Sequence, residues 1–406
     1  MKATQILRRS AIALLVTMAA SAASAAPGQI RRSDKPIHGQ YIVVFKPGAA
    51  KSVRHLADAL MQGRGGAVQH YYEHALQGFA AELTESEAMA LSRDPRVAYV
   101  AENSRLQMSG VQINPANVAL DRIDQRSYPL DHLYSYGTTG AGVNVYIIDS
   151  GINPNHTEFT GRGDRVFLDQ DWTNEGDFGV DCNGHGTAVA GIIGGTTYGV
   201  AKQAKLHVLR VAGCSGVPVA WDTLAALDWV VGGHVKPAVV NLSINDPCSA
   251  GCATGQLLID AVKAVLQAGV TVVNSAGNGG ACDANEYVYN APAYGSWPIV
   301  VGATLSGAGS DQRLTGTCTG TDVDIYAPGW ELTTASHLSA TGTTLFSYTS
   351  AAAPVVTGAA ARYLETHPTA LPGAVEYILT STGTPDIVLN VPAYPGTDST
   401  FLYVAP

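Results

Sequence analysis

Apolar runs of strand length alternate with helix-like segments through most of the chain. Such continuous apolar runs are typical of strands buried on both faces of a parallel sheet. The alternation predicts an α/β domain in which helices cover both faces of a mostly parallel sheet, with its functional site at the carboxyl ends of the strands. The predicted strands are 143–149, 206–212, 238–244, 270–276 and 298–304, and the clearest helical spacing occurs at 219–231 and 256–267.

A smaller region, residues 40–107, shows a different order of elements. Its pattern predicts a strand, a helix, two strands, a helix and a strand. Thr84 and Glu87 have the spacing of a capping box at the start of the second helix. This order predicts a small α+β, ferredoxin-like domain. The segments Pro27–His38 and Met108–Asn117 lack periodicity and are interpreted as linkers on either side of it.

Residues 1–25 have the layout of a secretory signal peptide. Lys2, Arg8 and Arg9 precede a short apolar run that ends near Ala23 and Ala25. The run is shorter than the roughly 20 apolar residues that span a bilayer, and no later stretch is that long. We therefore expect a secreted, extracellular and monomeric protein without a membrane anchor.

Composition and charge narrow the class of protein. The chain has 406 residues, 46% of them hydrophobic, so it can bury a substantial core. Its formal net charge of −9 argues against nucleic acid as a partner, because an acidic protein repels phosphate. The 6 cysteines suit disulfides in an oxidising compartment. A zinc site is the alternative, but the sequence contains no CxxC pair.

Ser350 stands just before an alanine-rich run within Leu345–Leu364 that has the character of a helix. The N-terminus of a helix offers unpaired N–H groups and a dipole that favours developing negative charge, which makes Ser350 a candidate nucleophile. A Thr-Ser pair before a helix is also an ordinary N-cap. The catalytic interpretation therefore requires a base and a carboxylate elsewhere in the chain.

His185 is the candidate base. It lies between two glycines and opens the predicted helix Thr187–Ile193. Glycines on both sides allow the backbone and a substrate to approach the imidazole. A solvent-facing loop histidine is the alternative. A dinucleotide-binding loop is disfavoured, because the GxGxxG spacing is absent.

Two further polar residues follow predicted strands. Asp149 ends the strand Val143–Asp149, where a buried carboxylate needs a partner such as a histidine N–H. Asn278 follows Ala276-Gly277 after another strand and can present its amide to an oxyanion. Structural capping by Asp149 and an ordinary turn at Asn278 are the alternatives. Because parallel strands end at one edge, we expect both residues at the same rim of the sheet.

Together these motifs resemble those of the subtilisin-like serine proteases, most closely the proteinase K branch. The matching motifs are DSGI at Asp149, NGHGTAVAG around His185, SAGN ending at Asn278 and TSAAAPVVTG around Ser350. Residues 120–126 resemble the start of mature enzymes of that branch. The resemblance implies an inhibitory pro-domain with linker in residues 26–108 and a subtilisin-like, three-layer peptidase domain in residues 109–406.

The resemblance also implies a mechanism. An Asp149–His185–Ser350 triad hydrolyses peptide bonds through an acyl-enzyme, Asn278 contributes to the oxyanion hole, and catalysis needs no cofactor. Protein or peptide substrates lie as a strand between two edge segments, and the pro-domain acts as an intramolecular inhibitor. The edge residues that the resemblance implies are Ser215, Gly216, Ser243, Ile244 and Asn245.

Disulfides and a metal site are implied in the same way. A structural Ca²⁺ site corresponds to Asp324 with the backbone carbonyls of Ser296 and Pro298, and such oxygen ligands suit Ca²⁺. A solvated loop aspartate is the alternative for Asp324. Two of the disulfides correspond to pairings of secreted relatives, and the third closes a small loop. The three pairs are Cys182–Cys214, Cys282–Cys318 and Cys248–Cys252.

The chain departs from the family pattern around the cleft. Tyr348 and Pro218 stand where glycine is usual, and Asn245 and Asp246 add side chains in a segment that is usually glycine-rich. Ala351 stands where methionine is common. Two hypotheses follow: an active endopeptidase made as a self-processed zymogen, and a catalytically weak homologue that binds a protein partner through its cleft.

Overall fold

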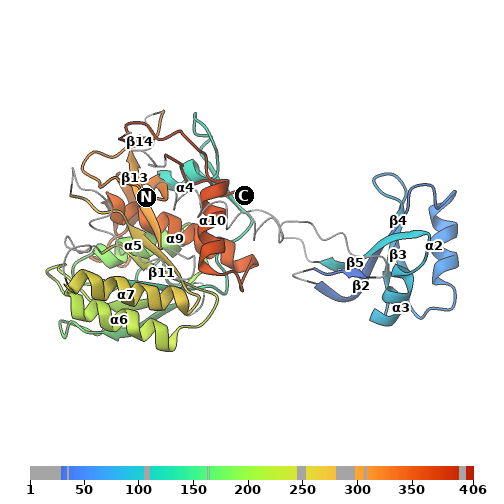
Figure 1. Cartoon of the computed structure of the whole chain (residues 1–406), viewed down its shortest axis with the longest axis horizontal. Coiled ribbons are helices and arrows are strands. Elements are labelled where there is room, and N and C mark those ends of the chain that lie inside the picture. Colours follow the sequence, from blue (N-terminus) through green and yellow to red (C-terminus); the bar gives the residue numbers. More distant parts are fainter. Residues whose placement is uncertain are drawn as a thin grey trace. The chain divides into compact units, whose positions relative to one another are not determined.

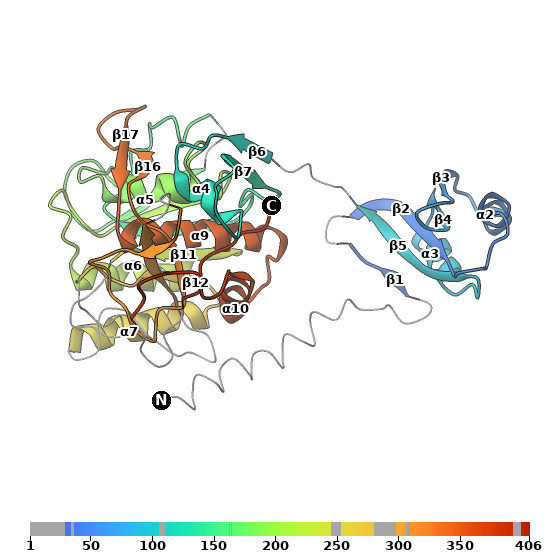
Figure 2. The same cartoon turned by 90° about the horizontal axis from the view of Figure 1, so that it is seen from above.

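The computed structural model divides the chain into two compact units, with the boundary between Met108 and Ser109. Figures 1 and 2 show the helices and strands of each unit. The structure describes residues 29–33, 36–104, 110–161, 163, 165–244, 253–279, 298–305, 309–392 and 399–406.

The smaller unit is one sheet with two helices. Its sheet order is β1-β5-β2-β4-β3, and the pairings are antiparallel except for the parallel pair β1–β5. The order β5-β2-β4-β3 confirms the ferredoxin-like arrangement predicted from the sequence. The elements are β1 (Ile30–Arg31), β2 (Pro36–Phe45), α2 (Val53–Met61), β3 (Val68–Tyr72), β4 (Gly78–Glu82), α3 (Glu85–Ser92) and β5 (Val97–Ser104).

Local sequence accounts for the start of α3. Thr84 Oγ1 accepts the N–H of Glu87 over 3.3 Å, and Glu87 Oε2 accepts the N–H of Thr84 over 2.8 Å. This is the predicted capping box. The prediction of a linker over Pro27–His38 is wrong in part, because Ile30 and Arg31 pair with β5 and β2 begins at Pro36. The two residues of β1 pair with a strand about 70 residues later in the chain. A strand this short shows no alternation of apolar and polar residues from which it could be predicted.

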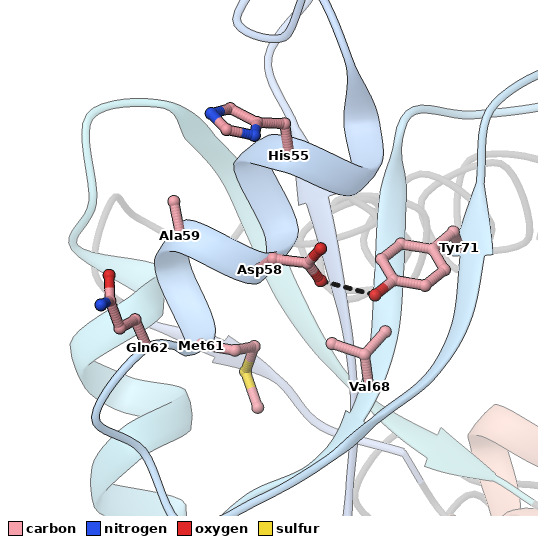
Figure 3. Close-up of a pocket in the computed structure, with 7 residues that line it drawn as sticks. All are labelled: His55, Asp58, Ala59, Met61, Gln62, Val68 and Tyr71. Atoms are coloured by element: carbon pink, nitrogen blue, oxygen red, sulfur yellow. Dashed lines mark hydrogen bonds between the residues drawn. The ribbon is translucent and has the colours of Figure 1, made fainter.

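An open groove of about 650 Å³ lies between α2 and β3 of this unit (Figure 3). Across it, the hydroxyl of Tyr71 donates to Asp58 Oδ1 over 2.5 Å. The groove belongs to the smaller unit, whereas the predicted catalytic residues belong to the larger one. Its lining residues are His55, Asp58, Ala59, Met61, Gln62, Val68 and Tyr71.

The larger unit is built on an 8-stranded sheet of order β14-β13-β12-β11-β8-β10-β9, with β15 paired to β13. Its pairings are parallel except for β13–β14, as the continuous apolar runs predict. The strands are β8 (Asn144–Asp149), β9 (Val166–Asp171), β10 (Lys205–Arg210), β11 (Ala238–Leu242), β12 (Thr271–Ser275), β13 (Ile299–Leu305), β14 (Gln312–Arg313) and β15 (Ile325–Pro328).

Helices cover both faces of this sheet, which confirms the three layers. Val145 and Ile147 of β8 enter the core shared with α5 and α9, whereas Tyr146 and Ile148 enter the core shared with α6 and α7. The alternation follows the period of two along a strand. Figure 1 shows α6 and α7 side by side. The helices are α4 (Val118–Ile123), α5 (His185–Gly194), α6 (Ala220–Gly233), α7 (Ala253–Gln267), α9 (Thr349–Thr366) and α10 (Pro372–Thr382).

Two short antiparallel strand pairs complete the larger unit. β6 (Gly110–Ile113) pairs antiparallel with β7 (Leu133–Tyr136), and β16 (Leu332–Ala335) pairs antiparallel with β17 (Thr343–Phe346). The first pair corrects the prediction that Met108–Asn117 is only a linker. None of the helices in the described residues has the length and apolar character needed to cross a membrane.

Candidate active site

The structure places Asp149 at the last position of β8, in the middle of the larger sheet. β8 lies between β10 and β11, where the strand order reverses, and α/β sheets bind ligands at such switch points. Asp149 is 2% exposed, so its carboxylate requires hydrogen bonds. Its Oδ1 accepts the N–H of Ser150 over 2.8 Å and lies 2.7 Å from His185 Nδ1.

The start of α5 brings His185 to Asp149. Gly184 precedes it with a φ of 109°, in the left-handed region that side chains rarely adopt. A Cβ atom at Gly186 would come within 2.2 Å of the carbonyl oxygen of Gly151. Only glycine therefore fits at Gly186, and the loop can approach the end of β8.

Charge around His185 favours its protonated form. Burial lowers the pKa of His185, but the charge and hydrogen bond of Asp149 raise it and the charge of Asp181 adds to this, so the pKa lies above its ordinary value. The ring of Phe346 meets the imidazole edge-on, with 5.0 Å between the ring centroids. This environment suits an imidazole that takes up a proton and holds it beside a carboxylate.

Asp181 and Ser150 connect the end of β8, which carries Asp149, to the start of α5, which carries His185. The sequence analysis missed both residues. Asp181 Oδ1 accepts from the hydroxyl of Ser150 over 3.0 Å and from the N–H of Gly184 over 2.8 Å. Its Oδ2 accepts from the N–H and the hydroxyl of Thr187 over 2.9 and 2.6 Å. Ser150 Oγ in turn accepts the N–H of Gly186 over 2.9 Å. An aspartate just before a predicted helix was the available signal, because aspartate commonly caps helices.

Ser350 is the second residue of α9, so its N–H is among the groups that lack an acceptor inside the helix. Ser243, directly after β11, contacts it closely: Ser243 Oγ donates to the carbonyl of Ser350, and Ser350 Oγ donates to the carbonyl of Ser243, both over 3.4 Å. Within the described residues, the Ser350 hydroxyl therefore bonds to Ser243 rather than to His185. Catalytic hydrogen bonds commonly tighten only when a substrate binds.

Asn278 is held by Thr349, the residue before Ser350. Asn278 Oδ1 accepts from the N–H of Thr349 over 3.1 Å and from its hydroxyl over 2.7 Å. The N–H of Gly277 donates to the same hydroxyl over 3.2 Å. Because these bonds use Oδ1, the side-chain NH₂ of Asn278 is left to donate to another acceptor. An amide donor beside a helix N-terminus can stabilise an oxyanion.

Tyr348 precedes this helix in an unusual backbone conformation, with φ 75° and ψ −166°. Residues other than glycine rarely occupy this region, and holding one there costs on the order of 1–3 kcal/mol. The N–H of Tyr348 donates to the carbonyl of Gly329 over 2.6 Å, and its own carbonyl accepts from the N–H groups of Ala351 and Ala352. Its ring meets that of Trp330 edge-on, with 6.0 Å between centroids.

The described residues include four of the five predicted edge residues of the cleft. Ser215 and Gly216 form a turn that the N–H of Gly216 closes by donating to the carbonyl of Gly213 over 2.9 Å. Ile244 follows Ser243 at the carboxyl end of β11. The fifth residue, Asn245, lies outside the described residues.

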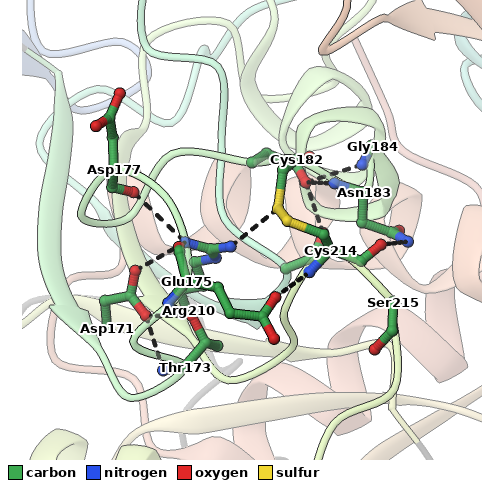
Figure 4. Close-up of a disulfide and its surroundings, with 12 residues drawn as sticks. Asp171, Thr173, Glu175, Asp177, Cys182, Asn183, Gly184, Arg210, Cys214 and Ser215 are labelled. Atoms are coloured by element: carbon green, nitrogen blue, oxygen red, sulfur yellow. Dashed lines mark hydrogen bonds and ion pairs between the residues drawn. A yellow bond between two sulfur atoms is a disulfide. The ribbon is translucent and has the colours of Figure 1, made fainter.

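A disulfide joins the loop before His185 to this turn (Figure 4). It pairs Cys182 with Cys214, as the family resemblance implies, with an S–S distance of 1.95 Å. Cys318 is disulfide-bonded as well. The other three cysteines of the predicted scheme, Cys248, Cys252 and Cys282, lie outside the described residues.

Arg210, the last residue of β10, is fully buried and holds the same loop (Figure 4). Its Nη1 donates to Asp171 Oδ2 over 3.0 Å and to the carbonyls of Glu175 and Asp177, and its Nη2 donates to Cys182 Sγ over 3.1 Å. Charge-assisted bonds to a buried guanidinium are stronger than neutral ones. Arg210 therefore stabilises the loop that carries Asp181, a second contribution that the sequence analysis missed.

The calcium site predicted around Asp324 is described only in part. Asp324 Oδ2 accepts the N–H of Val300 over 2.9 Å. Pro298, directly before β13, is buried. Ser296 lies outside the described residues. The site therefore stays a prediction.

A second group of carboxylates, missed by the sequence analysis, lies at the start of the larger unit. Asp121 and Asp124 each accept one backbone N–H, from His132 over 3.1 Å and from Ser135 over 2.7 Å. The Oδ1 atom of each is buried without a hydrogen-bond partner. Such oxygen atoms fit a hard cation such as Ca²⁺. Several aspartates within a dozen residues were the signal.

The pKa values of these carboxylates are raised, which also favours a bound cation. Burial raises the pKa of Asp124 to about 6, and the charges of Asp131 and Asp121 add to the rise. Burial and the charge of Asp131 likewise raise the pKa of Asp121. The carboxylates are costly to ionise together, and a bound cation would remove that cost.

Comparison with known proteins agrees with this geometry. A model of the subtilase family matches residues 140–400, which include Asp149, His185, Asn278 and Ser350. The chain belongs to the subtilase family. It is a serine protease, and a model of the peptidase inhibitor I9 family matches its residues 40–109.

Similar subtilases include one protein that is named as extracellular. The extracellular serine proteinase of Thermus sp. (strain Rt41A) is 42% identical over 377 residues, covering 88% of each chain. Alkaline serine exoprotease A of Vibrio alginolyticus is 37% identical over 319 residues, covering 77% of this chain and 56% of its own. The crystal structure of a cold adapted subtilisin-like serine proteinase matches with a TM-score of 0.63 and 36% identity, covering 71% of this chain and 98% of its own.

Proposed function

We propose that this subtilase is a secreted serine endopeptidase, made as a zymogen, in which Asp149, His185 and Ser350 are the catalytic triad. The observation that carries the proposal is the 2.7 Å contact between Asp149 Oδ1 and His185 Nδ1 at the switch point of the sheet. The position of Ser350 at the start of α9, against Ser243 beyond the neighbouring strand β11, supports it.

In the proposed mechanism, His185 takes the hydroxyl proton of Ser350 while Ser350 Oγ attacks the carbonyl carbon of a peptide bond. His185 then gives this proton to the departing amine, the C–N bond breaks, and an acyl-enzyme remains. Water releases the acyl group by the reverse sequence. Asp149 keeps Nδ1–H oriented and stabilises the imidazolium, which is consistent with the raised pKa of His185.

Negative charge develops on the carbonyl oxygen during each attack. The NH₂ group of Asn278 would donate to this oxygen, because its Oδ1 is already bonded to Thr349. The N–H of Ser350 would be the second donor. Removing one such side-chain donor typically lowers kcat by about 100- to 1,000-fold.

We further infer that residues 26–108 inhibit the peptidase domain until the chain cleaves itself, because an inhibitor-family model matches most of them. The name of one relative, an extracellular serine proteinase, together with the signal-like residues 1–25, supports export. We also infer a structural Ca²⁺ at Asp121 and Asp124, where the ion would bind their buried Oδ1 atoms without taking part in catalysis.

Active-site titration tests the function. A chromogenic ester that acylates quickly should give a burst of leaving group equal to the enzyme concentration, followed by slower turnover, because deacylation is then the slower step. Ser350→Ala should give no burst, and Ser381→Ala on α10 should behave as wild type. A folded, processed protein that gives no burst would instead favour a homologue that binds partners through its cleft.

A further inference from the structure

Tyr348 occupies a backbone conformation that favours glycine, two residues before Ser350. A glycine at this position would adopt φ 75° and ψ −166° without strain. Strained residues that persist in a structure cluster at binding and catalytic sites. The phenol ring is therefore a candidate for a role in ligand binding.

The surroundings of the ring leave one part of it open. A Cβ atom on Gly316 would lie 3.7 Å from Cε1 of Tyr348, so the ring covers this glycine turn. Trp330 supports it edge-on, with an angle of 89° between the ring planes. Tyr348 nevertheless remains 41% exposed. An aromatic surface thus lies open to solvent close to the nucleophile.

The position of His185 indicates which half of a substrate meets this surface. Phe346, two residues before Tyr348, contacts the imidazole edge-on. The imidazole gives its proton to the departing amine, so the leaving half of the substrate passes His185. Ser243, one of the predicted edge residues of the cleft, contacts Ser350 through its side chain and its carbonyl. The segment from Phe346 to Tyr348 therefore faces the leaving half.

We propose that Tyr348, supported by Trp330 and Phe346, forms a subsite for the residue directly after the scissile bond and favours an aromatic or large apolar side chain there. Aromatic rings attract one another in edge-on and offset arrangements. The imidazolium that forms on His185 during the reaction opposes a cationic side chain in the same place. The subsite deepens the proposed peptidase function and rests on it.

Glu331 is a charged residue beside the proposed subsite, and its charge could also select a substrate side chain. It follows Trp330, and its N–H donates to Ser347 Oγ over 2.9 Å. Its carboxylate would attract a lysine side chain rather than an aromatic one. A comparison of lysine with phenylalanine therefore distinguishes selection by charge from selection by the rings.

Acyl transfer measures this subsite directly. The full chain is expressed, and the secreted enzyme is acylated with a peptide ester. The leaving alcohol of the ester carries no amino acid, so the proposed subsite stays free for an added amide. Phenylalaninamide, leucinamide, lysinamide or glycinamide then competes with water. The amine nitrogen attacks the acyl carbon, the C–O bond to Ser350 breaks, and the amine proton passes through His185 to Ser350 Oγ. The ratio of aminolysis to hydrolysis reports how well each amide occupies the subsite.

Wild type should use phenylalaninamide about tenfold better than glycinamide, as expected for a few aromatic contacts. Tyr348→Gly should reduce this ratio about five- to tenfold, Trp330→Ala should reduce it less, and Tyr348→Phe should retain it. Trp221→Ala is the matched control, because Trp221 is an exposed tryptophan on α6 outside the proposed subsite.

Each contrary outcome has a separate meaning. Acylation of Tyr348→Gly with an unchanged amide ratio would overturn the subsite and leave the proposed function intact. A wild-type preference for lysinamide over phenylalaninamide would overturn the apolar class. Failure of wild type to acylate would overturn the proposed function itself. If Tyr348→Gly is not secreted, an unchanged ratio in Trp330→Ala would count against the subsite.

Discussion

Ser150 Oγ donates a hydrogen bond to Asp181 Oδ1 over 3.0 Å, and both residues are buried beside the Asp149–His185 pair. Ser150 follows Asp149 in the sequence, and its hydroxyl also accepts the N–H of Gly186, the residue after His185. The end of β8 and the start of α5 are therefore bonded to each other next to the proposed catalytic contact. This connection positions two groups that come from distant parts of the sequence.

Ser150→Ala should lower kcat about three- to tenfold with little change in KM, because a net loss of about 1 kcal/mol in positioning acts on the chemical step. Rates would be normalised to active sites counted by titration. Ser381→Ala removes an exposed hydroxyl on α10 and should leave both constants unchanged. A Ser150→Ala enzyme with wild-type kcat would show that the connection is not needed for catalysis.

Asp181→Asn should move the acid limb of the kcat/KM profile to lower pH. His185 must be neutral to accept a proton, so activity rises as pH increases through its pKa. The negative charge of Asp181 raises that pKa, and removing the charge lowers it. Asp260→Asn, on the exposed face of α7, is the control. An acid limb that stays in place or moves to higher pH would contradict the role of Asp181.

Tyr348→Gly should raise the free energy of unfolding by about 1–2 kcal/mol, because relief of backbone strain exceeds the entropy that glycine adds to the unfolded chain. Tyr348→Ala separates loss of the ring from relief of strain, since it removes the ring but keeps a side chain at φ 75°. Thermal unfolding of the Ser350→Ala background would avoid self-digestion. Equal stability of the glycine and alanine variants would contradict strain at this position.

Calcium removal should lower the melting temperature, and more so at higher pH. Burial raises the pKa of Asp124 to about 6 in the folded chain. The free energy of unfolding therefore falls as pH rises through that value and the carboxyl ionises. Without Ca²⁺, the melting temperature should fall between about pH 4 and about pH 6.5, and bound Ca²⁺ should reduce this fall.

Asp124→Asn provides the matched control for calcium. It should weaken both the pH dependence and the response to EDTA, whereas Asp324→Asn tests the other predicted site. An unchanged melting temperature after EDTA at about pH 7, in wild type, would exclude a stabilising ion at either site.

Ser350→Ala should accumulate as an unprocessed species of residues 26–406. The proposed self-cleavage falls near Met108–Val111, where the two units meet in the sequence and β6 begins at Gly110. Mass spectrometry and N-terminal sequencing of secreted protein from a host without other proteases provide the measurement. Normal maturation of Ser350→Ala in that host would show that another protease performs the cleavage.

The hydrophobic pattern alone determined the central strands and the two-sided cover of helices, because strands buried on both faces are apolar along their whole length. The capping box at Thr84 was equally accessible, since its bonds span only three residues. Asp149 and His185 could be predicted as partners because parallel strands and the loops after them end at one edge of a sheet.

Only the tertiary structure decided the features that depend on distant partners. Three contacts join segments that are distant in the sequence and do not specify one another. They are the pairing of β6 with β7, the bond between Asp181 and Ser150, and the contact of Ser350 with Ser243. The strained backbone of Tyr348 likewise arises from contacts that hold it from outside. Local sequence sets propensity and periodicity, but burial and long-range hydrogen bonds exist only once the chain has packed.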